Sequence, residues 1–185
     1  MAYFPFFADL QDKAVLIIGS GSKAAEKIER LRPFGACLHC ADHFAPALLD
    51  LHPALVIAAE EDRTANRRTA EACRAAGIPV NAVDDKDFCD FIFPSVLATR
   101  KLTVGISTGG ASPTAAVMIR ERLEEMLGDN IDTILEWLEE LRPRMTAEVV
   151  DPAVRKALWR RLFARALELD RPLTDTELHT IFKEI

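Results

Sequence analysis

The chain has 185 residues, of which 49% are hydrophobic and 28% are charged. This composition excludes a disordered chain and predicts a packed protein, with either one full domain and an appendage or two small domains. The formal net charge of −6 argues against a general nucleic-acid binder, whose binding surface would be basic.

Neither a membrane span nor a signal peptide is expected. No apolar run approaches the roughly 20 residues that cross a bilayer. The first residues, MAYFPFFADL, lack the basic region and the small-residue cleavage site of a signal peptide. We therefore expect a cytoplasmic protein that does not bind membranes, with its N-terminal aromatic side chains packed on the body of the domain.

In the first half of the chain, predicted strands alternate with predicted helices. Apolar runs predict strands at residues 13–19, 37–42, 54–60 and 78–84. Helical patterns follow the first and third runs, and they are closed by Pro33 and Gly35 and by Gly77. This alternation is typical of right-handed βαβ units and predicts an α/β fold with a Rossmann-like parallel sheet.

The pattern changes after the fourth strand. Residues 90–99 and 101–108 are apolar runs separated only by Arg100, too close for a crossover helix, so we expect a hairpin. From Pro113 onward only helical periods occur. The expected helices are residues 113–127, residues 130–142, one that begins at Asp151 and Pro152, and one that begins with a Thr174/Glu177 capping box.

The sequence GSGSKA, residues 19–24, matches the pattern G-x-G-x-x-A between a predicted strand and a predicted helix. In such a turn Gly19 permits the tight bend, Gly21 lets a diphosphate approach the backbone, and Ala24 allows the helix to pack closely on the strand. The free N–H groups and the helix dipole then bind the diphosphate. We therefore predict a dinucleotide site. Its residues are Gly19, Ser20, Gly21, Ser22, Lys23 and Ala24.

An acidic residue that binds the ribose should follow about 20 residues later, at the end of the second strand. Asp42 occupies that place. It either binds the ribose or is a solvated loop residue, and the sequence leaves both interpretations open. If Asp42 binds the ribose, the cofactor is NAD rather than NADP, because a carboxylate repels the 2′-phosphate.

The cysteines do not form a recognisable metal site. Cys37 and Cys40 have C-x-x-C spacing, but no second pair exists to complete a tetrahedral zinc site. They also lie in a predicted strand, where they point to opposite faces. We interpret the cysteines as reduced structural thiols and predict no bound metal.

The stretch STGGASP, residues 107–113, is the second informative motif. Ser112 followed by Pro113 is typical of an N-cap and a first helical residue, so a glycine-rich backbone lies beside a helix N-terminus. This stretch is either an anion-binding nest or a strand-to-helix turn that needs glycine for its angles. Arg120 and Arg122, on the helix that follows, are more typical of surface residues than of ligand clamps.

Several stretches, taken together and in chain order, resemble one family. They are GSGSKAAEK, NRRTAEACRAAGIPVNAVDD, DFIFPS and LTVGISTGGASPTAA. The chain resembles the precorrin-2 dehydrogenases, the NAD-dependent module of siroheme synthesis, which in some members is also the sirohydrochlorin ferrochelatase. ALWRRLF resembles the C-terminal helical signature of that family. The resemblance implies oxidation of precorrin-2 to sirohydrochlorin, and leaves open whether iron insertion is also catalysed.

The resemblance also implies residue roles. The aspartate of the family's N-x-V-D motif is the proposed catalytic acid/base, and it falls on Asp84. This place fits, because ligands of doubly wound sheets bind beyond the carboxyl ends of the strands and Asp84 ends a predicted strand. A capping role for Asp84 is the alternative. We expect Asp85, Asp87 and Asp90 to form a solvated turn and helix cap. The candidate substrate-binding residues are Asn81, Ser107, Thr108, Gly109, Gly110, Ser112 and Arg120.

The sequence departs from the family pattern in three places. Ser20 and Lys23 replace a glycine and a valine of the usual G-G-G-x-V-A, and Glu60 replaces a threonine in AAEED. Only residues 43–53 separate Asp42 from the next strand, where the family normally has a further helix and strand. The sheet is therefore expected to lack one edge strand.

These observations give the predicted organisation. Residues 1–112 form a Rossmann-like NAD-binding domain, residues 113–148 a helical dimerisation region, and residues 149–185 a C-terminal helical region. The resemblance implies a homodimer, because the family is homodimeric. In the expected helix 113–127, the apolar stripe is widened by Val117, Met118 and Leu127 beyond what a small helical region can cover, and a second subunit would bury this surplus.

Two functions of different classes remain. The first is an NAD-dependent oxidoreductase that acts on precorrin-2. The alternative is a non-catalytic nucleotide-binding regulatory protein or tetrapyrrole carrier, which the short 43–53 segment suggests.

Overall fold

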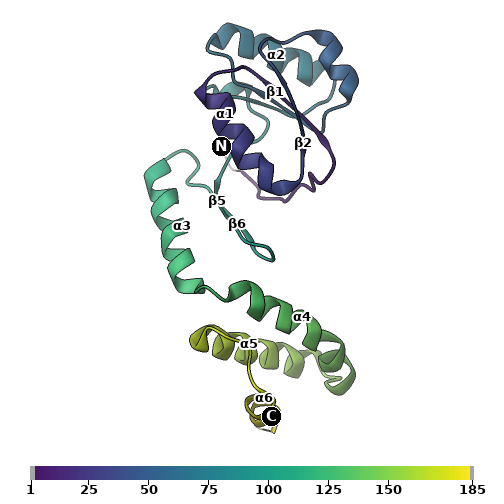
Figure 1. The fold of residues 1–185 in the computed structure, drawn as a ribbon, viewed down its shortest axis with the longest axis vertical. Helices are drawn as coiled ribbons and strands as arrows, with labels where there is room; N and C mark the ends of the chain where they lie inside the picture. The colour runs from purple at the N-terminus through teal and green to yellow at the C-terminus, as the bar shows by residue number, and fades with distance from the viewer. Residues whose placement is uncertain (1–2, 184–185) are drawn as a thin grey trace. The chain divides into compact units, whose positions relative to one another are not determined.

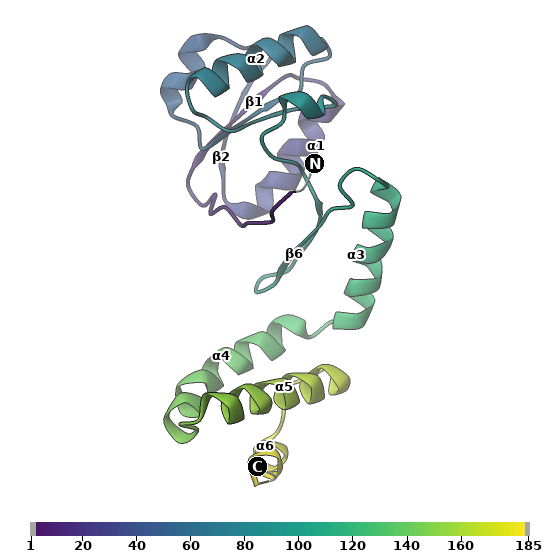
Figure 2. The ribbon, with the colours of Figure 1, turned by 180° about the vertical axis from the view of Figure 1, so that it is seen from behind.

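The computed structural model describes residues 3–183, and the chain forms two compact units (Figures 1 and 2). One unit is Phe6–Phe93, and the other contains the chain from Pro94 onward together with the residues before Phe6. The predicted division at residue 112 marks the change from strands to helices. The units divide earlier, because the hairpin that precedes residue 112 packs with the helices that follow it.

The Phe6–Phe93 unit contains the parallel sheet that the sequence predicts. The order of its strands is β2 (Cys37–Ala41), β1 (Ala14–Ile18), β3 (Leu55–Ala58) and β4 (Val80–Ala82). The central strands β1 and β3 are apolar and almost completely buried, as expected for a sheet covered on both faces. The chain runs from β1 to its neighbour β2 at one edge, and then crosses back to β3 on the opposite side of β1. The carboxyl ends of β1 and β3 therefore form a topological switch point.

Two helices cover the opposite faces of this sheet (Figure 1). On one face, α1 (Ser22–Leu31) contributes Ala24 and Leu31 to a core that contains Val15 and Ile17. On the other face, α2 (Arg63–Ala75) adds Ala70 and Cys73 to a second core with Leu16 and Ile18, the alternate residues of the same strand. This alternation follows from the two-residue period of a strand.

The edge of the sheet confirms the prediction of a missing strand. Residues 43–53 contain only the 3₁₀ helix η2 (Pro46–Leu51), so the sheet ends at β2. The predicted helix ends are also present. After α1 comes η1 (Arg32–Phe34) with Gly35 at φ +69°, and Gly77 follows α2 at φ +69°, both in the left-handed region that glycine adopts without strain.

In the unit from Pro94 onward, the predicted hairpin and helices are all present. Strands β5 (Ser95–Ala98) and β6 (Thr103–Ile106) pair antiparallel, and α3 (Pro113–Leu127) packs against them. Helices α4 (Ile131–Glu148), α5 (Pro152–Leu169) and α6 (Asp175–Lys183) form a separate core around Ile134, Met145 and Leu162. In both views α4 and α5 lie side by side (Figures 1 and 2).

Helix α4 is longer than predicted. It continues through Pro143, beyond the predicted end at residue 142, although proline lacks the N–H of a helical hydrogen bond. Leu141 and Met145, on either side, are 8% and 0% exposed. The packing of these two side chains in the core outweighs the lost hydrogen bond. The sequence around Pro143 does not reveal this packing, because the contacts come from other helices.

The prediction that the N-terminal aromatic side chains pack on the domain is wrong. Phe4, Phe6 and Phe7 are 85%, 74% and 74% exposed. Both faces of the sheet are already covered by α1 and α2, which leaves no apolar sheet surface for these rings. None of the described helices combines the length and the apolar composition needed to cross a bilayer.

Candidate functional site

The glycine turn after β1 has the geometry that the G-x-G-x-x-A pattern predicts. Gly19 has φ +125°, and a Cβ on it would lie 2.5 Å from the carbonyl oxygen of Ala59, so only glycine fits between β1 and the end of β3. Gly21 has open space instead, because its nearest neighbour would be Glu61 Oε1 at 3.9 Å. Ala24 is 1% exposed and packs in the core beneath α1.

The N-terminus of α1 suits an anion. Gly21 is its N-cap residue and provides no capping side chain. The first N–H groups of a helix have no partner within the helix, and the positive end of the helix dipole lies there. Together with the open space at Gly21, this arrangement fits the diphosphate of a dinucleotide.

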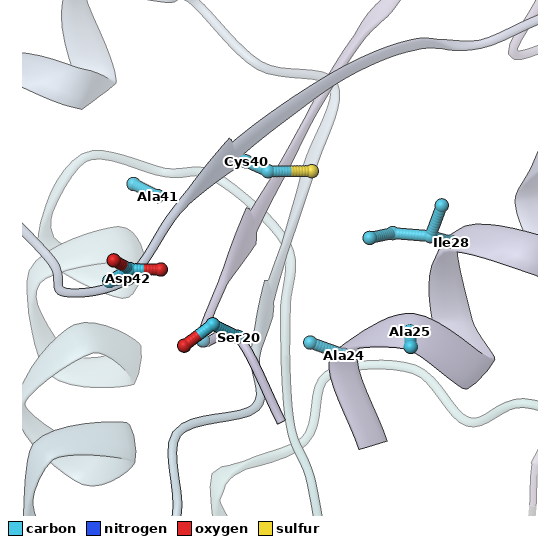
Figure 3. A pocket seen from close by; sticks show the side chains of 8 residues that line it. Ser20, Ala24, Ala25, Ile28, Cys40, Ala41 and Asp42 are labelled. Carbon is cyan, nitrogen blue, oxygen red and sulfur yellow. The ribbon is translucent and has the colours of Figure 1, made fainter. Parts of the chain in front are cut away.

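A pocket of about 400 Å³ adjoins this turn (Figure 3). Asp42 lies at the end of β2 and lines the pocket together with Ser20 from the turn, which fits the prediction that a carboxylate meets the ribose. The pocket is lined by Gly19, Ser20, Ala24, Ala25, Ile28, Cys40, Ala41 and Asp42. The sequence did not indicate that Ile28 and Cys40 line this pocket. Ile28 packs against the core beneath α1, and the order of the strands places β2 beside β1 at this pocket.

Lys23 connects the glycine turn to Asp84. It is the second residue of α1, and its ammonium group forms an ion pair with the Asp84 carboxylate. Asp84 follows β4 with φ +62°, a left-handed conformation that aspartate tolerates better than most residues. The capping alternative is not supported, since the next helical turn, η3 (Lys86–Phe88), has Asp85 as its N-cap residue.

Asp85 is a buried structural residue, and the prediction that it belongs to a solvated turn is wrong. It is 6% exposed, its carboxylate accepts a hydrogen bond of 2.7 Å from Arg67 Nε, and Arg63 lies at 3.5 Å. The hydrogen bond from Arg67 is the main cause that lowers the pKa of Asp85, and burial opposes it. Both arginines come from α2, so this helix anchors the loop that carries Asp84.

Asp90 and Asn81 fix the other end of the same loop. Asp90 accepts hydrogen bonds from the Val80 N–H and from Arg74 Nε, both at 3.0 Å, and it is also exposed to solvent, as predicted. Asn81 is 7% exposed, and its Nδ2 donates to the carbonyl of Phe91 at 2.8 Å. Asp87 is exposed, as expected. A substrate contact by Asn81 stays a prediction.

A contact between a histidine and a carboxylate lies next to Asp42. His43 Nδ1 and Glu60 Oε2 are 2.7 Å apart, and the Asn66 side chain bonds both the N–H and the carbonyl of Glu60 at 2.9 and 2.8 Å. The hydrogen bond to Glu60 is the main cause that raises the pKa of His43. The sequence indicated Glu60 only as a departure from a family motif. Its contact with His43 was not predicted, because His43 lies 17 residues earlier in the chain.

The loop at residues 107–112 belongs to the other unit and is bonded within itself. Thr108 Oγ1 accepts from the Ser112 N–H at 3.1 Å, and Ser107 Oγ accepts from the Gly109 N–H at 3.1 Å. Gly109 and Gly110 have φ +63° and +87°, and Ser112 caps α3 through the Ala115 N–H. Two donors of the predicted nest therefore already have partners, and its role in substrate binding stays a prediction.

Arg120 is engaged on the surface of α3. Its guanidinium pairs with Glu124 and Glu121 of the same helix. A ligand carboxylate would have to displace these partners, so the proposed contact of Arg120 with substrate also remains a prediction.

The described residues offer no metal cluster of three or more histidine, cysteine or acidic side chains. All four cysteines are free thiols, with Cys37 and Cys40 exposed and Cys73 buried. Burial raises the pKa of Cys73 to about 11, which keeps this thiol protonated and chemically inert near neutral pH.

Two known protein families match segments of this chain. Residues 38–95 match the family described as "Putative NAD(P)-binding", and residues 100–126 match "Sirohaem biosynthesis protein central". The siroheme synthase of Methylococcus capsulatus (strain Bath) is 35% identical over 87% of this chain and 38% of its own length. Siroheme synthase 1 of Pectobacterium atrosepticum is 35% identical over 88% of this chain and 38% of its own length.

The chain is similar along most of its length to one segment of these siroheme synthases. This confirms the family resemblance drawn from the motifs. The chain spans less than two fifths of the length of the relatives it matches. Among solved structures, "SirC, precorrin-2 dehydrogenase" has a TM-score of 0.62 at 16% identity and covers 98% of both chains, which confirms the fold.

Proposed function

We propose that this chain is an NAD-dependent dehydrogenase that oxidises precorrin-2 to sirohydrochlorin in siroheme biosynthesis. One observation carries the proposal: the Asp84 carboxylate is paired with Lys23 on the first turn of α1, the turn whose backbone fits a diphosphate. A candidate base and a candidate cofactor site therefore adjoin. The match to an NAD(P)-binding family and to siroheme synthases supports both assignments.

In this proposal the turn at Gly19–Ala24 binds the diphosphate through its N–H groups, and Asp42 accepts hydrogen bonds from the ribose hydroxyls. The Asp42 carboxylate disfavours a 2′-phosphate, so NAD is preferred over NADP. Bound NAD⁺ supplies the hydride acceptor. Loss of a hydride from precorrin-2 must be accompanied by loss of a proton, and in this proposal Asp84 receives that proton.

The substrate is an acid with eight carboxylates, and its binding residues are part of the proposal. The loop at residues 107–112 and Arg120 provide N–H donors and a cation for some of these carboxylates, and Asn81 orients the loop before Phe91. The N–H groups of Gly109 and Ser112 and the guanidinium of Arg120 have protein partners, so a substrate carboxylate that binds them exchanges with these partners.

Incubation of the purified protein with precorrin-2 and NAD⁺ tests the function directly. A dehydrogenase produces NADH absorbance and sirohydrochlorin in equal amounts. A nucleotide-binding carrier or regulatory protein, the alternative that the short 43–53 segment suggests, binds tetrapyrrole without producing NADH. Anaerobic incubation of sirohydrochlorin with ferrous iron decides separately whether this chain also inserts iron.

We also propose that the chain is a homodimer. On α3, Val117, Met118, Ile119 and Met126 are 41%, 55%, 47% and 59% exposed, whereas Leu127 is half-buried. Four large apolar side chains on one helix form more exposed apolar surface than scattered single residues do. A second copy that covers α3 buries them, as the homodimeric family implies.

A further inference from the structure

The Lys23–Asp84 ion pair joins two segments that the chain separates by 61 residues. It links the first turn of α1 to the loop after β4. Both side chains are exposed, at 51% for Lys23 and 63% for Asp84. Ion pairs of such exposure contribute little to stability. The loop does not need this pair for its position, because α2 already holds it at two later residues. Arg67 pairs with Asp85, and Arg74 pairs with Asp90.

The same ammonium group lies on the turn that fits a diphosphate. Lys23 follows Gly21 by two residues, and α1 has no capping side chain there. A lysine on this turn therefore has two anionic partners when a dinucleotide is bound: the Asp84 carboxylate and the diphosphate. Charge-assisted hydrogen bonds to phosphate oxygens are among the stronger ones in proteins, and the helix N-terminus adds to the attraction of the anion.

The two members of the pair differ in how they are attached to the fold. Asp84 has its backbone in the left-handed region, and its carbonyl accepts a hydrogen bond of 3.2 Å from Arg63, so its position is fixed from α2. Lysine carries its charge on a flexible four-carbon stem with three rotatable donors. The ammonium group is the partner that moves.

We propose that Lys23 is a positioning residue that exchanges between Asp84 and the diphosphate of the bound dinucleotide. Without cofactor, its ammonium occupies a lone pair of the Asp84 carboxylate. With the diphosphate present, the ammonium turns to it, and the carboxylate is released to receive the substrate proton. This inference rests on the proposed function. It makes cofactor binding the event that removes the ammonium partner from the Asp84 carboxylate, so the carboxylate loses this competing partner when a hydride acceptor is in place.

Calorimetric titration of the full chain with NAD⁺ tests the exchange without any turnover. Loss of the ammonium in Lys23→Met weakens NAD⁺ binding about 10-fold, since one charged hydrogen bond is lost. Loss of the competing carboxylate in Asp84→Asn tightens NAD⁺ binding about 3-fold. Asparagine tolerates the left-handed backbone of residue 84, so the loop keeps its conformation. In the double variant, Asp84→Asn no longer tightens binding, because no ammonium remains to be released.

Two control variants separate exchange from general electrostatics. Lys86→Met removes the charge of an exposed lysine in the same loop and leaves NAD⁺ affinity within 2-fold of the wild type. Lys23→Arg keeps a cation on the turn and restores most of the affinity that Lys23→Met loses. A merely structural tie between α1 and the loop predicts instead that Lys23→Met and Asp84→Asn both weaken NAD⁺ binding.

The outcomes distinguish this inference from the proposed function. If Asp84→Asn tightens NAD⁺ binding equally with and without Lys23, charge repulsion alone acts and the exchange is refuted. If wild-type protein binds NAD⁺ and oxidises precorrin-2 but neither variant changes affinity, the exchange is refuted while the proposed function stands. If the wild-type protein does not bind NAD⁺ at all, the proposed function itself fails.

Discussion

Substitutions at the two glycines of the 19–24 turn should separate stability from cofactor binding. In Gly19→Ala, the new Cβ lies 2.5 Å from the Ala59 carbonyl oxygen and 2.9 Å from the Glu60 nitrogen, both backbone atoms, at a φ of +125°. The unfavourable φ costs about 1–2 kcal/mol. Displacement of the β3 backbone adds about 1–3 kcal/mol. A loss near 3 kcal/mol lowers the Tm by roughly 10 °C for a chain of this size.

Gly21→Val makes the opposite prediction. Gly21 has a φ of −80°, and a Cβ there meets only Glu61 Oε1 at 3.9 Å, so valine fits the protein. The Tm should fall by no more than about 4 °C, which reflects a poorer N-cap residue. The branched side chain fills the space of the diphosphate, and NAD⁺ affinity should fall at least about 100-fold. Scanning calorimetry and titration calorimetry measure both quantities on each variant. Unchanged NAD⁺ affinity in folded Gly21→Val would refute the dinucleotide assignment, and a Gly19→Ala protein as stable as Gly21→Val would refute the close approach to β3.

Three further predictions concern catalysis, assembly and pH. Asp84→Asn should fold normally yet lower the rate of NADH formation about 100-fold or more, and a near-normal rate would remove this carboxylate from the mechanism. Light scattering at micromolar concentration should show a dimer that Met118→Glu converts to a monomer, so a monomeric wild type would contradict the proposed assembly. Because Glu60 raises the pKa of His43, the stability from this pair is fully present below the unfolded value of about 6.5 and is lost as pH rises through the folded value. Glu60→Gln should lower the His43 pKa in an NMR titration, and an unmoved midpoint would argue against the contact.

Features that depend on local backbone geometry were predictable from the sequence. The tight bend at Gly19 was predicted correctly, because only three residues separate the end of β1 from the start of α1. The N-cap at Asp151 and the capping box of Thr174 and Glu177 were also correct, since each bonds within three residues of itself. The strand missing between residues 43 and 53 followed from length, because 11 residues cannot hold a helix and a strand.

Features that depend on contacts between distant segments were not predictable in the same way. Asp85 stands in a run of acidic residues that reads as a solvated turn, and its burial depends on Arg63 and Arg67, which precede it by 22 and 18 residues. A signal did exist. Arg63, Arg67 and Arg74 lie on α2 at helical spacing, and a βαβ unit returns the chain past that helix, so a basic row facing the acidic segment after β4 could have been proposed.

The way in which the sheet ends at β4 explains how Asp84 is presented. β4 is an edge strand of three residues, and an edge normally exposes unpaired N–H and carbonyl groups. Here Asp90 takes the place of a further strand. Its carboxylate accepts from the Val80 N–H, and its own N–H donates to the Val80 carbonyl at 2.8 Å. The chain must therefore turn back directly after β4, and Asp84 is the residue at which it turns. Because the turn is closed by Asp90 and anchored by α2, the Asp84 side chain pairs only with Lys23 among the residues that the structure describes, and this exposure at the carboxyl end of the sheet is what the proposed role of Asp84 requires.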